Sequence, residues 1–167
     1  MRKLITSLIF AALPFVGSAQ SLRFAYLSYD KVMKSMAEYT VAMNNIKSLR
    51  QQYDAEIKRT EEEFNNKYEE FLEVQQTLAP SIRNKRQVEL QDMMNRGIAF
   101  KGEAERLLRQ AEDDALAPVR KKLSDSISQY GRSEGYAFIL NSDNNNLPFV
   151  NVEYGEDITE TIINKLR

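Results

Sequence analysis

The chain contains no cysteine and no histidine among its 167 residues. Without cysteine no disulfide bond can stabilise the fold, so stability must come from packing and from association of subunits. The same absence removes the usual zinc ligands, and also the thiol and imidazole groups on which many catalytic sites depend. We therefore expect no enzyme, no metal and no organic cofactor.

Two polar runs remain as candidates for chemistry. Residues 61–63 are all glutamate, but adjacent residues of a helix point in different directions, so this run indicates a solvated helix face. A second run has the one-three-five spacing of calcium ligands, at Asn141, Asp143 and Asn145. However, Asn146 stands where that loop needs glycine, and Val152 stands where it needs a bidentate glutamate. Neither run predicts a site.

The N-terminus carries an apolar run at residues 4–16, preceded by Arg2 and Lys3 and followed by the small residues 17–19. This order is typical of a secretory signal peptide. Its 13 residues are too few to span a bilayer stably, which disfavours a permanent membrane anchor. We expect cleavage after Ala19, so that residues 1–19 are removed and the mature chain begins at Gln20.

Loss of that peptide lowers the basic count from 23 to 21, against 24 acidic residues. The resulting net charge of about −3 argues against a nucleic-acid-binding protein. Residues 54–73 contain eight acidic and three basic residues, whereas residues 78–101 contain five basic and two acidic ones. Opposite signs would assist pairing of two neighbouring helices. A basic cluster near the turn is either a solvated flank or a docking patch: Arg83, Lys85 and Arg86.

Apolar residues recur at alternating steps of four and three, with breaks at Arg50, Thr60 and Lys67, through Val32, Met36, Tyr39, Met43, Ile46, Tyr53, Ile57, Phe64, Phe71, Val74 and Leu78. This period predicts one coiled-coil helix over about residues 30–78. Pro80 interrupts it, and a second helical region of similar length follows over residues 81–130. The equal lengths favour an antiparallel helical hairpin, an arm of residues 30–130 with its turn near 78–81.

Three helix breakers lie on the return segment. Gly97 and Gly102 fall opposite roughly Glu62 and Ile57, and each costs about 1 kcal/mol relative to alanine in a helix interior. These two glycines predict that the helix is locally pliable there; the alternative is that they are tolerated without any role. Pro118 predicts a bend nearer the end of the arm.

Short strands flank the predicted arm. The aromatic run at residues 22–29 reads as a strand, residues 136–140 as a second, and residues 147–152 as a third after a turn at 141–146. The second helix ends near Gly131, and a last helix starts at a capping box beginning with Asp157. The fold class is therefore α+β, with a β-rich body of residues 20–29 and 131–167. A body this small predicts an oligomer.

Methionine and aromatic side chains suit surfaces that accept many partners. We hypothesise that four of them face an interior cavity and bind a client: Met33, Tyr68, Met94 and Phe100. Those on the stripe are explained by packing between helices.

Three segments together resemble the Skp/OmpH family of periplasmic chaperones: residues 24–27 (Phe-Ala-Tyr-Leu), 134–140 and 154–159. The resemblance implies a homotrimer whose bodies form a trimerisation unit, with hairpins that extend as tentacles around a cavity. It further implies that unfolded outer-membrane proteins are held there without ATP, in the periplasm of a diderm bacterium. Family members are often strongly basic, whereas this mature chain is slightly acidic. The cluster at residues 83–86 therefore predicts at most a weak contact with anionic lipid.

The physical pattern also fits a second function. A structural coiled coil of the envelope, either a spacer or an adhesion stalk, needs the same long helices. Such a protein would bind one folded partner and ignore denatured chains.

Overall fold

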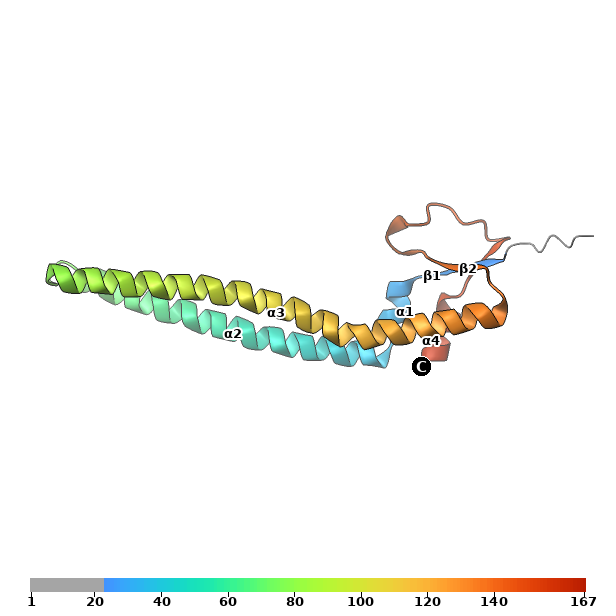
Figure 1. The fold of residues 1–167 in the computed structure, drawn as a ribbon, viewed down its shortest axis with the longest axis horizontal. Coiled ribbons are helices and arrows are strands. Elements are labelled where there is room, and N and C mark those ends of the chain that lie inside the picture. Colours follow the sequence, from blue (N-terminus) through green and yellow to red (C-terminus); the bar gives the residue numbers. More distant parts are fainter. Residues whose placement is uncertain (1–22) are drawn as a thin grey trace, which may run out of the picture.

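The computed structural model describes residues 23–167. The predicted signal peptide therefore lies outside the described residues. Long helices dominate, and a small sheet stands at one end (Figure 1). The elements in chain order are β1 (Phe24–Leu27), α1 (Tyr29–Ser35), α2 (Ala37–Val74), α3 (Pro80–Glu134), β2 (Phe138–Asn141), a 3₁₀ turn (Asp143–Asn145), β3 (Gly155–Asp157) and α4 (Thr159–Leu166). The prediction of long helices with a small sheet is confirmed.

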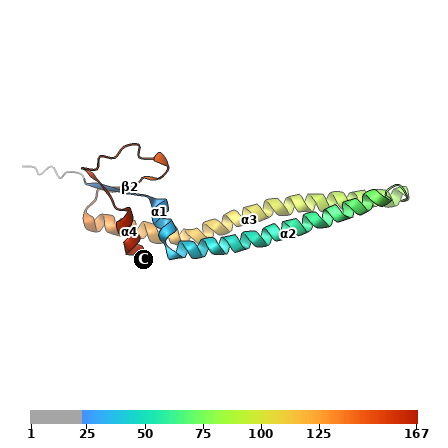
Figure 2. The ribbon, with the colours of Figure 1, turned by 180° about the vertical axis from the view of Figure 1, so that it is seen from behind.

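The two longest helices lie side by side. The chain runs away from the sheet along α2 and returns along α3, as Figures 1 and 2 show from opposite sides. With 55 residues, α3 is about 80 Å long. Pro80 occupies its first turn, where a missing N–H breaks no helical hydrogen bond. At the other end, Gly135 adopts the left-handed conformation (φ 71°) that stops the helix.

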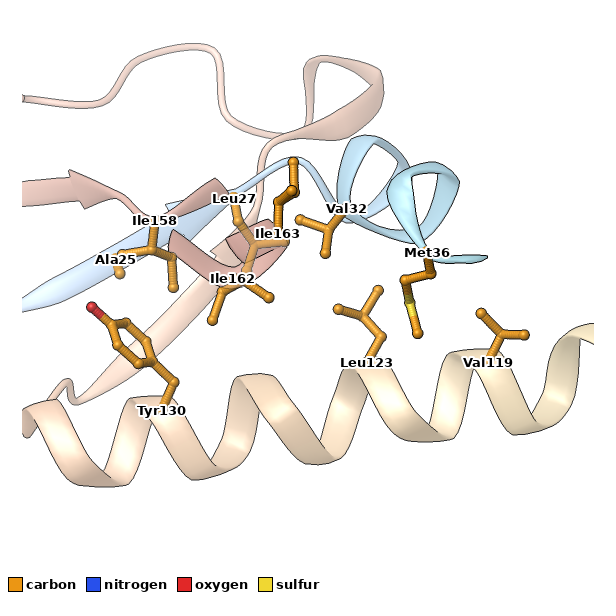
Figure 3. Close-up of a cluster of buried hydrophobic side chains, with 10 residues drawn as sticks. All are labelled: Ala25, Leu27, Val32, Met36, Val119, Leu123, Tyr130, Ile158, Ile162 and Ile163. Atoms are coloured by element: carbon orange, nitrogen blue, oxygen red, sulfur yellow. The ribbon is translucent and has the colours of Figure 1, made fainter. Parts of the chain in front are cut away.

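The prediction of one continuous helix over residues 30–78 is wrong at Met36. This residue is extended (ψ 136°), so that α1 ends at Ser35 and α2 begins at Ala37. The Ser35 hydroxyl donates to the Val32 carbonyl oxygen at 2.6 Å and satisfies a carbonyl at the end of α1. Met36 itself is fully buried, because the break turns its side chain into the core of the body (Figure 3).

The sheet is parallel, with β1 in the centre between β2 and β3. The predicted strand at residues 147–152 is wrong, since β3 begins only at Gly155. Pro148 has no N–H to offer a ladder, and Asn144 and Asn145 have positive φ angles that curl the chain away after β2. Register is instead set by β1, where Phe24 pairs with both Phe138 and Gly155.

One face of the sheet is buried and the other is half-buried. Two residues of β1, Ala25 and Leu27, point into a core shared with α1, α3 and α4, whose members are drawn in Figure 3: Ala25, Leu27, Val32, Met36, Val119, Leu123, Tyr130, Ile158, Ile162 and Ile163. On the opposite face Phe24 stacks on Phe138 with ring centroids 5.5 Å apart. The core thus includes α1 and part of α3, which the sequence pattern had placed in the arm.

The polar run after β2 supports the start of α1. The Asp143 carboxylate accepts from the Ser28 hydroxyl at 2.6 Å and from the Asp30 backbone N–H at 2.8 Å. Burial alone would raise the pKa of Asp143, but these hydrogen bonds outweigh it and lower that pKa below the usual value. Asn141 accepts from the backbone N–H of Tyr29 and of Asp143. The run is therefore a helix cap, and within residues 23–167 no three potential metal ligands gather.

Candidate functional site

The distal half of the helix pair, residues 57–74 of α2 and 80–101 of α3, is thinly packed. In the half nearer the body, α2 buries Ala42 and Ile46, and α3 buries a row that includes Ala104 and Leu108. In the distal half Phe71 is the one residue of the pair that is buried. Several large apolar side chains there are exposed.

Two grooves run between the helices in the distal half. The first, here called the apolar groove, has a volume of about 360 Å³ and is lined by Ile57, Thr60, Glu61, Phe64, Asn65, Met93, Met94, Gly97, Ile98, Phe100 and Lys101. At Gly97 the two helices lie close together, since Thr60 Cγ2 lies 3.7 Å from the position that a Cβ would take. The predicted neighbour of Gly97 was Glu62, two residues away.

The second, here called the charged groove, lies nearer the turn. Its volume is about 660 Å³ and it is lined by Lys67, Glu70, Phe71, Val74, Thr77, Leu78, Ile82, Arg86, Glu89, Leu90, Asp92, Met93 and Arg96. Residues two apart on a helix point to nearly opposite sides. Asn65 and Ile98 line the apolar groove, whereas Lys67 and Arg96, each two residues away from one of them, line the charged groove. The grooves therefore open on opposite sides of the helix pair.

Exposed apolar residues border the apolar groove. Tyr68 (44% exposed) and Leu72 (45%) continue the row of Phe64 along α2, and Met94 (40%) and Ile98 (66%) form a row along α3. The rings of Phe64 and Tyr68 stack with centroids 5.9 Å apart. We call these four exposed residues with the apolar groove the apolar face.

The four residues predicted to bind a client are not all together. Met94 and Phe100 line the apolar groove, and Tyr68 stacks on one of its walls. Met33 lies far from them, because it packs against the core of the body. The apolar face also includes Leu72 and Ile98, which the sequence analysis did not select. The helical spacing could have identified them, because Leu72 lies four residues after Tyr68 and Ile98 lies four residues after Met94.

The basic cluster is split by the structure. Arg86 lines the charged groove and donates to Glu89 at 3.1 Å, while Lys85 pairs with the same carboxylate at 3.8 Å. Arg83 is partly buried beside the turn. One glutamate thus offsets part of the positive charge of this cluster.

Charge does not join the helices in the distal half. Each ion pair within residues 57–101 links residues three or four apart in one helix, such as Lys58 with Glu62 and Lys67 with Glu63. Glu38 and Lys122 do link α2 to α3, near the body. The expected electrostatic pairing of the helices is therefore found near the body rather than in the distal half.

The sequence profile of the family described as "Outer membrane protein (OmpH-like)" matches residues 23–166. The chain belongs to the OmpH-like family. A crystal structure of an OmpH-like protein from Caulobacter crescentus, described as a candidate outer membrane chaperone, has a similar fold. Its TM-score is 0.71 at 18% identity, over 86% of this chain and 82% of that one. Among curated proteins none matches this chain.

The resemblance predicted from the sequence is thus confirmed. The OmpH-like match extends over all of the described helices and strands, from β1 to α4. In residues 23–167 no helix is both long and apolar enough to cross a membrane.

Proposed function

We propose that this OmpH-like chain is an ATP-independent holdase chaperone of the periplasm of a diderm bacterium. It binds unfolded outer-membrane proteins between helical arms and prevents their aggregation, with no catalytic step. One observation carries the proposal: the distal half leaves Tyr68, Leu72, Met94 and Ile98 exposed around a groove. Large apolar side chains grouped on one face mark a binding surface, and here they lie on the part of the chain farthest from the sheet (Figure 1).

The proposed assembly is a homotrimer of the mature chain, residues 20–167. Residues 20–29 and 131–167 form the trimerisation body, and residues 30–130 form an antiparallel coiled-coil arm that turns near residues 78–81. Both outer strands of the sheet have a free edge, and the body exposes Phe149 (81%), Val152 (77%) and Tyr154. Paired edges and covered apolar residues would supply the stability that so small a body lacks. Several arms around one client would add many weak contacts.

A weak contact with anionic lipid through Arg83, Lys85 and Arg86 belongs to the same proposal. Glu89 offsets part of their charge, so the contact would be salt-sensitive and subordinate to client binding. No nucleic-acid partner is proposed, given the acidic net charge.

The test is suppression of aggregation. A β-barrel protein unfolded in urea is diluted into buffer with an equimolar amount of the oligomer and no nucleotide, and light scattering is recorded. We expect the wild-type chain to keep scattering low. A spacer or stalk would leave it unchanged, and scattering equal to that of the client alone, with the oligomer intact, would contradict the holdase.

A matched pair of variants assigns the activity to the apolar face. Serine at Tyr68, Leu72, Met94 and Ile98 should abolish suppression, because the exposed apolar area is removed while the buried core is untouched. Serine at three other exposed apolar residues of the distal half, Val74, Ile82 and Val88, serves as the control and should retain it. Equal loss in both variants would show that this face is not the site.

A further inference from the structure

We propose that the apolar face selects unfolded segments in which lysine or arginine is interspersed among apolar residues, and disfavours acidic ones. This inference rests on the proposed holdase function and specifies its class of client. It comes from the distribution of unpaired charge around the apolar face.

On α2 an acidic row borders the apolar row. Residues 64, 68 and 72 form the apolar row at steps of four, and residues 61, 65, 69 and 73 form the adjacent row. Three of these four are glutamates: Glu61, which lines the apolar groove, Glu69 and Glu73. In the described structure none of the three lies within ion-pair distance of a basic side chain. By contrast, three other glutamates of the same helix form ion pairs: Glu56 with Arg59, Glu62 with Lys58, and Glu63 with Lys67.

On α3 the border of the apolar face is nearly neutral. Gln91 donates to Asn95 at 3.1 Å beside the row of Met94 and Ile98, and Lys101 is the one basic residue that lines the apolar groove. Arg86 and Arg96 line the charged groove on the other side of the helix pair. Around the apolar face the unpaired glutamates Glu61, Glu69 and Glu73 therefore outnumber the one basic residue of the groove, Lys101.

An unfolded segment that contains both apolar and cationic residues matches both the apolar side chains and the negative charge of this surface. The methylene stems of lysine and arginine can lie on apolar side chains while their charged ends reach the carboxylates of Glu61, Glu69 and Glu73. The stacked rings of Phe64 and Tyr68 offer aromatic faces to a cation. An acidic segment would instead meet three unpaired carboxylates, and like charges at an interface oppose binding.

The test uses two synthetic unfolded peptides with the same apolar residues, spaced by lysine in one and by glutamate in the other. Their affinity for the intact oligomer is measured by fluorescence anisotropy. At low salt we expect the lysine peptide to bind about tenfold more tightly, since exposed ion pairs each contribute modestly. At 1 M salt the Debye length falls to about 3 Å, and the two affinities should converge.

Two variants with equal change in net charge separate local from global electrostatics. Glutamine at Glu61, Glu69 and Glu73 should remove most of the preference for lysine. Glutamine at the paired residues Glu56, Glu62 and Glu63 should retain it. Equal affinities of the wild type for both peptides, a preference for glutamate, or equal loss in the two variants would overturn the inference. If the oligomer binds neither peptide and fails to suppress aggregation, the proposed function fails. If it suppresses aggregation but binds neither peptide, only the inference fails.

Discussion

Asp143 shows how one side chain joins distant parts of the body. Its carboxylate lies after β2 in sequence, yet it accepts from Ser28 and from the backbone N–H of Asp30, at the start of α1. The first N–H groups of a helix have no partner within the helix, and an acceptor outside it satisfies them. Asp143 therefore fixes the 3₁₀ turn against α1, a contact about 115 residues apart in sequence.

Replacing Asp143 with asparagine should lower the free energy of unfolding by about 1–2 kcal/mol, because the neutral amide has one acceptor oxygen where the carboxylate offers two charged ones to Ser28 and Asp30. The pKa of Asp143 is lowered in the folded chain, so its stabilisation is present at neutral pH and is lost as the pH falls below the ordinary range of aspartate. As the pH falls, the free energy of unfolding should therefore decrease less in the variant than in the wild type. Urea denaturation over a pH series measures both effects, with the exposed Asp125→Asn as control. Identical curves would contradict this role.

At the scale of elements, the sequence predicted the helices better than the sheet. The period of 3.5 residues is a local signal, and residues 42–64 of α2 follow it in their burial. The break at Met36 is not local, because it depends on the body core that accepts this side chain. The same holds for β3, since a strand of three residues is defined by its partner β1 and not by its composition.

The glycines of α3 make an element-scale prediction. Near Gly97 a methyl group would meet only Thr60 Cγ2 at 3.7 Å, and near Gly102 it would meet nothing within 4 Å. Each change to alanine should therefore stabilise the helix by about 1 kcal/mol. Hydrogen–deuterium exchange of residues 95–104 should become slower, and the exposed Ala99→Gly should make it faster. No change in exchange would show that these glycines do not set the pliability of α3.

At the scale of the whole molecule, two groups of exposed apolar residues lie far apart. One group is the apolar face of the distal half, and the other lies on the body and includes Phe149 and Val152. The helix pair keeps them far apart, as Figures 1 and 2 show. We assign the distal group to client binding and the body group to self-association, so that the two activities should be separable by mutation.

Serine at Phe149 and Val152 should therefore dissociate the oligomer without unfolding the chain. Both side chains are more than three quarters exposed in the single chain, so their loss removes little intramolecular packing. Light scattering should report a lower mass at micromolar concentration while the helical circular dichroism is kept. Serine at Val41 and Val88, two exposed residues of the long helices, is the control. An unchanged mass would place self-association elsewhere.

The sequence by itself determined the long helices, the helix start at Pro80 and the resemblance to the OmpH-like family. These depend on signals within a few residues: a hydrophobic period, a proline and short motifs. Tertiary structure alone decided the parallel order β2-β1-β3, the packing of Met33 and Met36 in the body, and the separation of the two grooves. Each of these depends on which distant segment lies opposite, and a linear pattern does not contain that information. Met33 and Met94 are the same residue type, yet Met33 packs on the core of the body and Met94 lines the apolar groove.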